Sequence, residues 1–235
     1  MKLKAHDLAR MMDFSIVRPE VDEKELREFA ANVRKYRFIG AHVLPYFVAE
    51  LNALLEGCDD VLIGTGIGFP FGNHKTAVKV HEARLAIADG CKELDMVINI
   101  SALLSGRYQY VKDDIRAVVD TAAGRTVKVI FEVHYLKDYD IEKACECCIE
   151  AGAKFVKTAT GHTPTGATPH NIALMKKCVG DQLKIKASGG IRDLKTMIEL
   201  YKLGAERFGI GAASGLKILE ECAALPGGIV EYSTL

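Results

Sequence analysis

The sequence predicts a (β/α)8 barrel, as a single domain over residues 1–235, and three observations support it. The chain has 235 residues, close to the usual size of about 250 for such barrels. Short apolar runs recur eight times, and charged amphipathic stretches separate them. Strands that alternate with helices pair in parallel, and eight of them fit a closed barrel better than an open sheet.

The eight apolar runs are the expected barrel strands. They cover residues 12–17, 39–45, 60–70, 93–100, 127–133, 154–160, 183–190 and 207–214. Helices are expected between them, for example over 74–90, 140–153 and 193–205, where apolar residues follow helical spacing. Each of these three stretches ends at or near a glycine, which commonly stops a helix.

The composition excludes several classes of function. Lys plus Arg and Asp plus Glu number 31 each, so no net positive field indicates nucleic acid as a partner, and no polybasic stretch indicates a membrane surface. No segment approaches about 20 consecutive apolar residues. The seven cysteines show neither disulfide nor zinc-site spacing, and the histidines form no metal motif. We expect a soluble cytoplasmic protein without a metal.

Polar residues inside the expected strands mark the chemistry, because barrel enzymes place their active sites where the strands end. These residues are Asp13, His42, Asp95, Glu132, His134, Lys157, Lys184 and Lys186. Lys157 and Lys186 lie on consecutive strands, about 4.8 Å apart in a sheet. Burial and a second ammonium nearby both disfavour the charged form, so one of these lysines is expected to have a lowered pKa.

A lowered pKa is what a nucleophilic amine needs. About 1 in 2,500 molecules of an ordinary lysine is neutral at pH 7, and a drop of about 3 units raises this to near one third. The neutral amine can form a Schiff base, which stabilises an adjacent carbanion. The alternative is that both lysines are structural, extending to a strand end or pairing with Asp95 and Glu132. Lys184 is interpreted as structural.

The acidic residues have open roles at this point. Asp95 needs a partner if it is buried, and it could relay protons to the reacting carbons. Asp13 either supports the site or caps a turn. Glu132 fits an ion pair better than proton transfer.

Two glycine-rich segments follow the last two strands. "KASGGIRD" (186–193) places Gly189 and Gly190 before a helix that starts near Asp193, and "GIGAASGL" (209–216) places Ser214 at another helix start. Backbone N–H groups at such points bind phosphate, and barrels often form the site from these two loops. Alternatively, the glycines serve tight turns alone.

The segments "MDFS", "GFPFGN", "ELDMVIN", "GAKFVKTATG" and "KASGGIRD" together resemble deoxyribose-phosphate aldolase, a class I aldolase family, over nearly the whole chain. The resemblance implies reversible cleavage of 2-deoxy-D-ribose 5-phosphate to acetaldehyde and glyceraldehyde 3-phosphate, without metal or organic cofactor. It makes Lys157 the Schiff-base lysine and Lys186 the lysine that tunes it. Asp95 is then the proton relay, and Asp13 assists.

The resemblance also implies a substrate-binding set and a homo-oligomer, often a dimer. The phosphate contacts would be Gly161, Gly189, Gly190, Gly211 and Ser214, and Ser15 and Thr160 complete the substrate-binding candidates. The chain departs from the family at His42, where cysteine is usual, at His162, where lysine is frequent, and in "RFGIGAASG". Three other hypotheses stay open: a class I aldolase on a different phosphorylated sugar, a sugar-phosphate isomerase with Glu132 or Asp95 as base, and a non-catalytic sugar-phosphate sensor.

Overall fold

The structure, a computed structural model, describes residues 2–232, so the expected domain bounds at residues 1 and 235 lie outside the described chain. Within residues 2–232, eight strands close into a barrel in chain order, and all neighbours are parallel. They are β2 (Met12–Ile16), β3 (Gly40–Val43), β4 (Leu62–Ile67), β5 (Glu93–Val97), β6 (Thr126–Ile130), β7 (Phe155–Lys157), β8 (Lys184–Ser188) and β9 (Arg207–Gly211). Each overlaps one predicted run, so the (β/α)8 prediction is confirmed.

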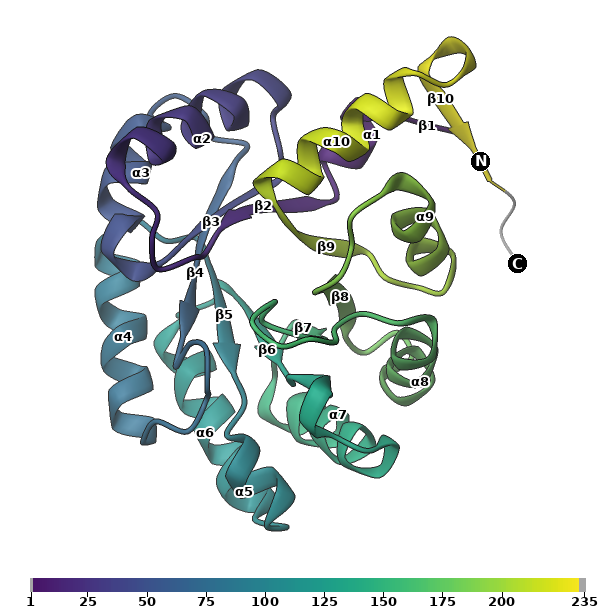
Figure 1. The fold of residues 1–235 in the computed structure, drawn as a ribbon. Helices are drawn as coiled ribbons and strands as arrows, with labels where there is room; N and C mark the ends of the chain where they lie inside the picture. Colours follow the sequence, from purple (N-terminus) through teal and green to yellow (C-terminus); the bar gives the residue numbers. More distant parts are fainter. Residues whose placement is uncertain (1, 233–235) are drawn as a thin grey trace.

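Helices surround the strands as an outer ring (Figure 1). The longer ones are α2 (Glu23–Tyr36), α3 (Val48–Leu54), α4 (Thr76–Ala88), α6 (Tyr108–Thr121), α7 (Asp138–Ala151), α8 (Pro169–Val179), α9 (Leu194–Lys202) and α10 (Ala212–Ala223). Shorter elements are α1 (Ala5–Ala9), α5 (Ile100–Leu104) and the 3-10 turns η1 (Pro45–Phe47), η2 (Val133–Tyr135) and η3 (Pro226–Gly228). The three predicted helices are confirmed as α4, α7 and α9.

Local sequence explains where several helices begin and end. The side chains of Asp22, Thr168 and Asp193 accept hydrogen bonds from backbone N–H groups in the first turns of α2, α8 and α9. Gly152 ends α7 in the left-handed conformation, which glycine adopts without steric cost. The three capping side chains fix where the strand-to-helix loops at the barrel mouth end, whereas Gly152 lies in the connection from α7 to β7 at the opposite end.

A small antiparallel sheet outside the barrel was not predicted. It pairs β1 (Lys2–Lys4) with β10 (Ile229–Glu231), next to α1 and α10 (Figure 1). An exposed ion pair joins Lys2 to Glu231 at 2.8 Å. The sheet links the two ends of the described chain.

The barrel has an apolar outer layer and a charged interior. Successive strand residues point to opposite faces, and in β5 Leu94 and Met96 are buried against the helices while Asp95 points inward. On β2, Phe14 stacks on Phe29 of α2 and on Phe38, with ring centroids 5.0 and 4.0 Å apart. Among the described residues, no helix is both long and apolar enough to span a bilayer.

Candidate active site

Lys157 and Lys186 lie directly opposite each other on β7 and β8. Both donate hydrogen bonds to the same oxygen, Oδ2 of Asp95, at 2.8 Å from Lys157 Nζ and 2.7 Å from Lys186 Nζ. Lys186 also donates to Oδ2 of Asp13. Lys157 is 7% exposed, and the other three residues are more deeply buried. The structure therefore brings the four predicted catalytic residues into one cluster.

The pKa of Lys186 is lowered to about 8. Burial is the largest cause, and the positive charges of Lys157 and Lys128 act in the same direction against the attraction of Asp13 and Asp95. The sequence predicts such a drop for one of the two amines and connects it with the nucleophile; in the structure it falls on Lys186, which the resemblance makes the tuning lysine. A noticeable fraction of Lys186 is consequently neutral near pH 7.

Both carboxylates of the cluster stay ionised. Burial alone would raise the pKa of Asp95, but the charges of Lys128, Lys157 and Lys186 outweigh it and hold that pKa well below the usual value. The pKa of Asp13 is lowered in the same way against burial, chiefly by Lys128 and Lys186. The alternative of Asp13 as a turn cap is wrong, because its carboxylate lies inside the barrel.

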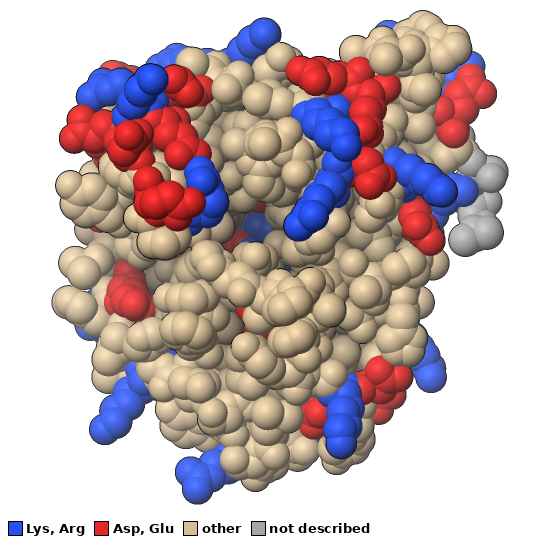
Figure 2. Space-filling model, viewed as in Figure 1, with Lys and Arg blue, Asp and Glu red and all other residues tan. Residues whose placement is uncertain are grey.

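Two adjoining cavities open at the strand ends, and Figure 2 shows a hollow near the centre of this face with blue and red atoms at its bottom. The smaller cavity, about 30 Å³, is lined by the four clustered residues. The larger, about 560 Å³, lies between the loops after β2, β7, β8 and β9. All seven predicted substrate-binding residues line it: Ser15, Thr160, Gly161, Gly189, Gly190, Gly211 and Ser214.

The lining of the larger cavity combines glycines and other small residues with the charged residues Arg18, Glu25 and Arg192. Gly161, Gly189 and Gly190 have φ values of 91°, 86° and 83°, in the region that favours glycine, and successive N–H groups in such turns can bind an anion. Ser214 lies in the first turn of α10, where unpaired N–H groups and the helix dipole attract anions. Ser15 and Thr160 line both cavities, so a ligand could reach from one to the other.

Comparison with known proteins decides the family. A family model described as DeoC/LacD family aldolase matches residues 64–221. The chain belongs to this family. It is 44% identical to a deoxyribose-phosphate aldolase of Klebsiella pneumoniae over 92% of this chain and 88% of the relative. It is 41% identical to one of Rhizobium meliloti over 98% and 93%.

Solved structures agree with this placement. The structure titled "QR15, an Aldolase" superposes with a TM-score of 0.86 at 40% identity, covering 92% of this chain and 95% of that one. A tetrameric deoxyribose phosphate aldolase from Aeropyrum pernix gives 0.85 at 29% identity, covering 94% and 92%. This chain is therefore an aldolase, and hence a lyase.

The sequence reasoning missed three charged residues of this aldolase beneath Lys157 and Lys186: Lys128, Glu93 and Arg207. Lys128 Nζ lies 3.0 Å from Asp13 Oδ2 and 2.6 Å from Glu93 Oε2. Arg207 donates to Asp13 Oδ1 at 2.7 Å. With Asp95, Lys157 and Lys186, the interior holds four cations and three carboxylates. One excess positive charge in a buried cluster favours loss of a proton, which agrees with the lowered pKa of Lys186.

Other predicted polar residues of the aldolase lie outside this cluster. Glu132 accepts hydrogen bonds from the Thr160 N–H, the Thr160 hydroxyl and Thr163. The expected lysine pairing of Glu132 is wrong, because Lys157 turns to Asp95. His134 is exposed in η2. Lys184 is exposed at the start of β8 and pairs with Glu206 at 3.1 Å, which confirms it as structural.

The aldolase also has a group with the geometry of a metal site that the sequence motifs did not indicate. One ligand atom each of Asp13, His42 and Asp95 lies within 4.8 Å of the others. However, Lys128 and Lys186 already neutralise both carboxylates. A divalent cation here would face these ammonium groups directly, and their repulsion disfavours its binding.

Proposed function

We propose that this chain is a class I aldolase that reversibly cleaves 2-deoxy-D-ribose 5-phosphate to acetaldehyde and D-glyceraldehyde 3-phosphate through a Schiff base on Lys157. The observation that carries the proposal is the pair of amines on Asp95 Oδ2, beside a cavity lined by anion-binding loops. The names of the relatives from Klebsiella pneumoniae and Rhizobium meliloti support the choice of substrate.

Both amines line the smaller cavity, and Lys157 is the better candidate for the covalent step because it is 7% exposed, against 1% for Lys186. To attack a carbonyl, its ammonium must first lose a proton. Asp95 Oδ2 contacts both amines and offers a path to the neutral form of Lys186. We assign Asp95 as the relay, Lys186 as the acceptor and Asp13 as the residue that holds Lys186 in place.

Bond cleavage then follows from the protonated Schiff base. Asp95, the proposed relay, accepts the proton of the C3 hydroxyl while the C2–C3 electron pair moves into the iminium, which gives an enamine on Lys157 and releases glyceraldehyde 3-phosphate. Protonation of the enamine at C2 and hydrolysis release acetaldehyde and restore the amine. Lys186 and Asp95 are the groups placed to return the proton.

The larger cavity would hold the phosphate. Backbone N–H groups around Gly189, Gly190 and Gly211 and the first turn of α10 are the proposed contacts, together with Ser214 and Gly161. Ser15 and Thr160 would contact the sugar, because they line both cavities. A phosphate held here leaves the aldehyde end directed toward Lys157.

Borohydride reduction tests the proposal. The protein is treated with acetaldehyde and sodium borohydride, and peptide mapping by mass spectrometry locates the adduct. We expect an ethyl group on Lys157. The variant Lys157→Arg should stay folded, form no adduct and lose turnover, because a guanidinium stays protonated. Lys184→Arg is the matched control. An isomerase or a sensor would form no adduct, and that result would refute the assignment. Retained turnover in Lys157→Arg would also refute it.

We also propose that the chain acts as a single barrel domain over residues 1–235, in the cytoplasm, and as a homo-oligomer, with a dimer expected. Seven free cysteines suit a reducing compartment. Exposed Tyr46 and Phe71 supply apolar surface for self-association. Sedimentation analysis would show the oligomeric state, and a strictly monomeric protein at working concentration would contradict the dimer.

A further inference from the structure

His42 is a buried side chain whose place in the reaction is unexplained. It lies on β3 with 4% of its surface exposed, and neither ring nitrogen has a hydrogen-bond partner within residues 2–232. Oδ1 of Asp95 also lacks a hydrogen bond there. Leaving a buried polar group unpaired costs about 1–3 kcal/mol, so such groups need an explanation.

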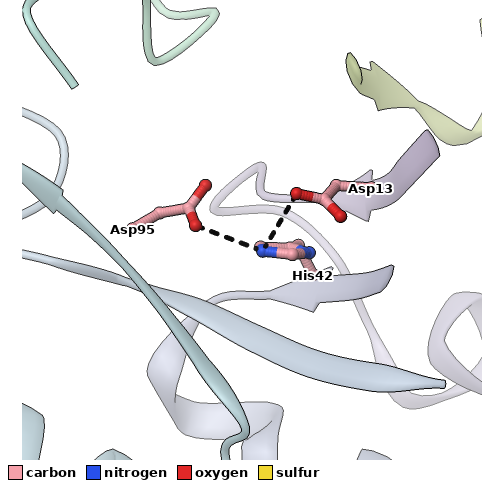
Figure 3. Close-up of side chains that lie close together, drawn as sticks. All are labelled: Asp13, His42 and Asp95. Carbon is pink, nitrogen blue, oxygen red and sulfur yellow. Dashed lines mark ion pairs between the residues drawn. The ribbon is translucent and has the colours of Figure 1, made fainter. Parts of the chain in front are cut away.

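The unpartnered atoms face each other. Nε2 of His42 lies 3.4 Å from Asp95 Oδ1 and 3.7 Å from Asp13 Oδ2 (Figure 3). In Figure 3 the ring lies between the two carboxylates, with one nitrogen directed toward both. A separation of 3.4 Å is within reach of a hydrogen bond, and contacts of this kind often tighten when substrate binds.

The neighbouring strands leave space for this ring. Gly64, opposite His42 on β4, has no side chain, and a Cβ there would lie 2.2 Å from His42 Nε2. A Cβ on Gly40 would lie 2.2 Å from Asp13 Oδ1 and 3.2 Å from His42 Cε1. Two glycines thus accommodate the imidazole and the carboxylate beside it. A residue with a side chain at Gly64 would clash with the imidazole at this position.

The surroundings also decide which nitrogen carries the proton. The charged groups that face His42 are Asp13 on β2, Asp95 on β5, Lys128 on β6 and Lys186 on β8. Burial, followed by the charge of Lys186, lowers the pKa of His42 despite the two carboxylates, so the ring is neutral near pH 7 and has one N–H. Both carboxylates lie on the Nε2 side, and the proton is therefore most favourable on Nε2.

We infer that His42 is a positioning residue for the proposed reaction: its Nε2–H donates to Asp95 Oδ1 and keeps Asp95 Oδ2 between the two reactive amines. Lys128 Nζ lies 3.3 Å from the same Oδ1 and competes for it. Without the donor, the carboxylate can rotate toward Lys128 and away from Lys157. The inference rests on the proposed function, because it concerns the proton path between Lys157 and Lys186.

Two amide variants separate the ring nitrogens. Glutamine places an N–H near the position of Nε2, whereas asparagine places one near Nδ1. We expect His42→Asn to lower kcat about tenfold, because proton transfer slows, and to leave KM within about twofold, because His42 does not line the larger cavity. His42→Gln should recover kcat to within about threefold of wild type. Melting temperatures of both variants show whether each is folded.

A second measurement needs no variant to be active. Nitrogen-15 spectra of histidine-labelled wild-type protein report the tautomer of His42, assigned by the signal that His42→Gln removes. We expect the Nε2–H form. The inference would be overturned if the spectra show the Nδ1–H form. It would also be overturned if His42→Gln has a kcat no higher than that of His42→Asn, or if the variants change KM alone. Borohydride trapping at Lys157 in wild type is scored separately, and its failure would overturn the proposed function instead.

Discussion

The lowered pKa of Lys186 gives the sharpest prediction for this aldolase. With a pKa of about 8, roughly one molecule in ten has a neutral Lys186 at pH 7. An ordinary lysine near 10.5 would give about one in 3,000, so the cluster raises the fraction able to accept a proton about 300-fold. If the neutral form takes the proton from Lys157, kcat/KM should rise with pH and level off above about pH 8.

Removing the amine tests this directly. Lys186→Leu should lower kcat/KM by about 100-fold or more, in the range of a lost general base, and abolish the inflection near pH 8. The assay follows acetaldehyde release with a coupled NADH-dependent dehydrogenase between pH 6 and 9.5. Lys184→Leu is the matched control on the same strand, because its exposed pair with Glu206 contributes little. A profile without an inflection in wild type, or an unchanged inflection in Lys186→Leu, would refute the reasoning.

Three further predictions concern a buried ion pair, the glycine opposite His42 and the absence of a metal requirement. In the wild-type protein, buried Asp114 lies 2.6 Å from Lys79 Nζ. Lys79→Met would leave Asp114 without this partner, so the free energy of unfolding, measured by urea titration, should fall by about 3–5 kcal/mol. We expect little change in kcat. Gly64→Ala should lower the free energy of unfolding by about 1–3 kcal/mol and also lower kcat, because the added methyl group displaces His42. An unchanged melting temperature would contradict the claim that Gly64 leaves space for the ring. Incubation with EDTA should leave turnover unchanged, and inhibition that zinc reverses would favour a metal aldolase.

Local patterns in the sequence carried much of the fold. The alternation of apolar runs and amphipathic stretches predicts the barrel, because each strand and each helix has its own periodicity. The sequence places Lys157 and Lys186 on adjacent strands, so their side chains are expected to lie close together. The register of β7 and β8, in which the two residues are directly opposite, confirms this. The pairing of β1 with β10 had no such signal, because three-residue strands are too short to show a pattern.

The lower part of the charged interior was harder to predict. Lys128 stands between Val127 and Val129 in "VKVIFEV", and this alternation could have placed it on the inner face. Glu93 and Arg207 are the first residues of their strands. A charged residue at that position is easily taken as part of the preceding loop rather than as part of the barrel interior. Their partners are distant in sequence: Lys128 and Asp13 are 115 residues apart. Such pairings depend on barrel register, which a single sequence does not specify.

In the proposed function, the two adjoining cavities separate substrate recognition from the chemical step. The loops after β2, β7, β8 and β9 line the larger one, whereas the charged residues Asp13, Asp95, Lys157 and Lys186 line the smaller one. Loop residues can therefore be exchanged to accept a different aldehyde partner while the ionic network underneath stays intact. For protein engineers this separates two variables: redesign of residues 211–214, which line the larger cavity and not the smaller one, should alter which acceptor is used before it alters the proposed amine chemistry.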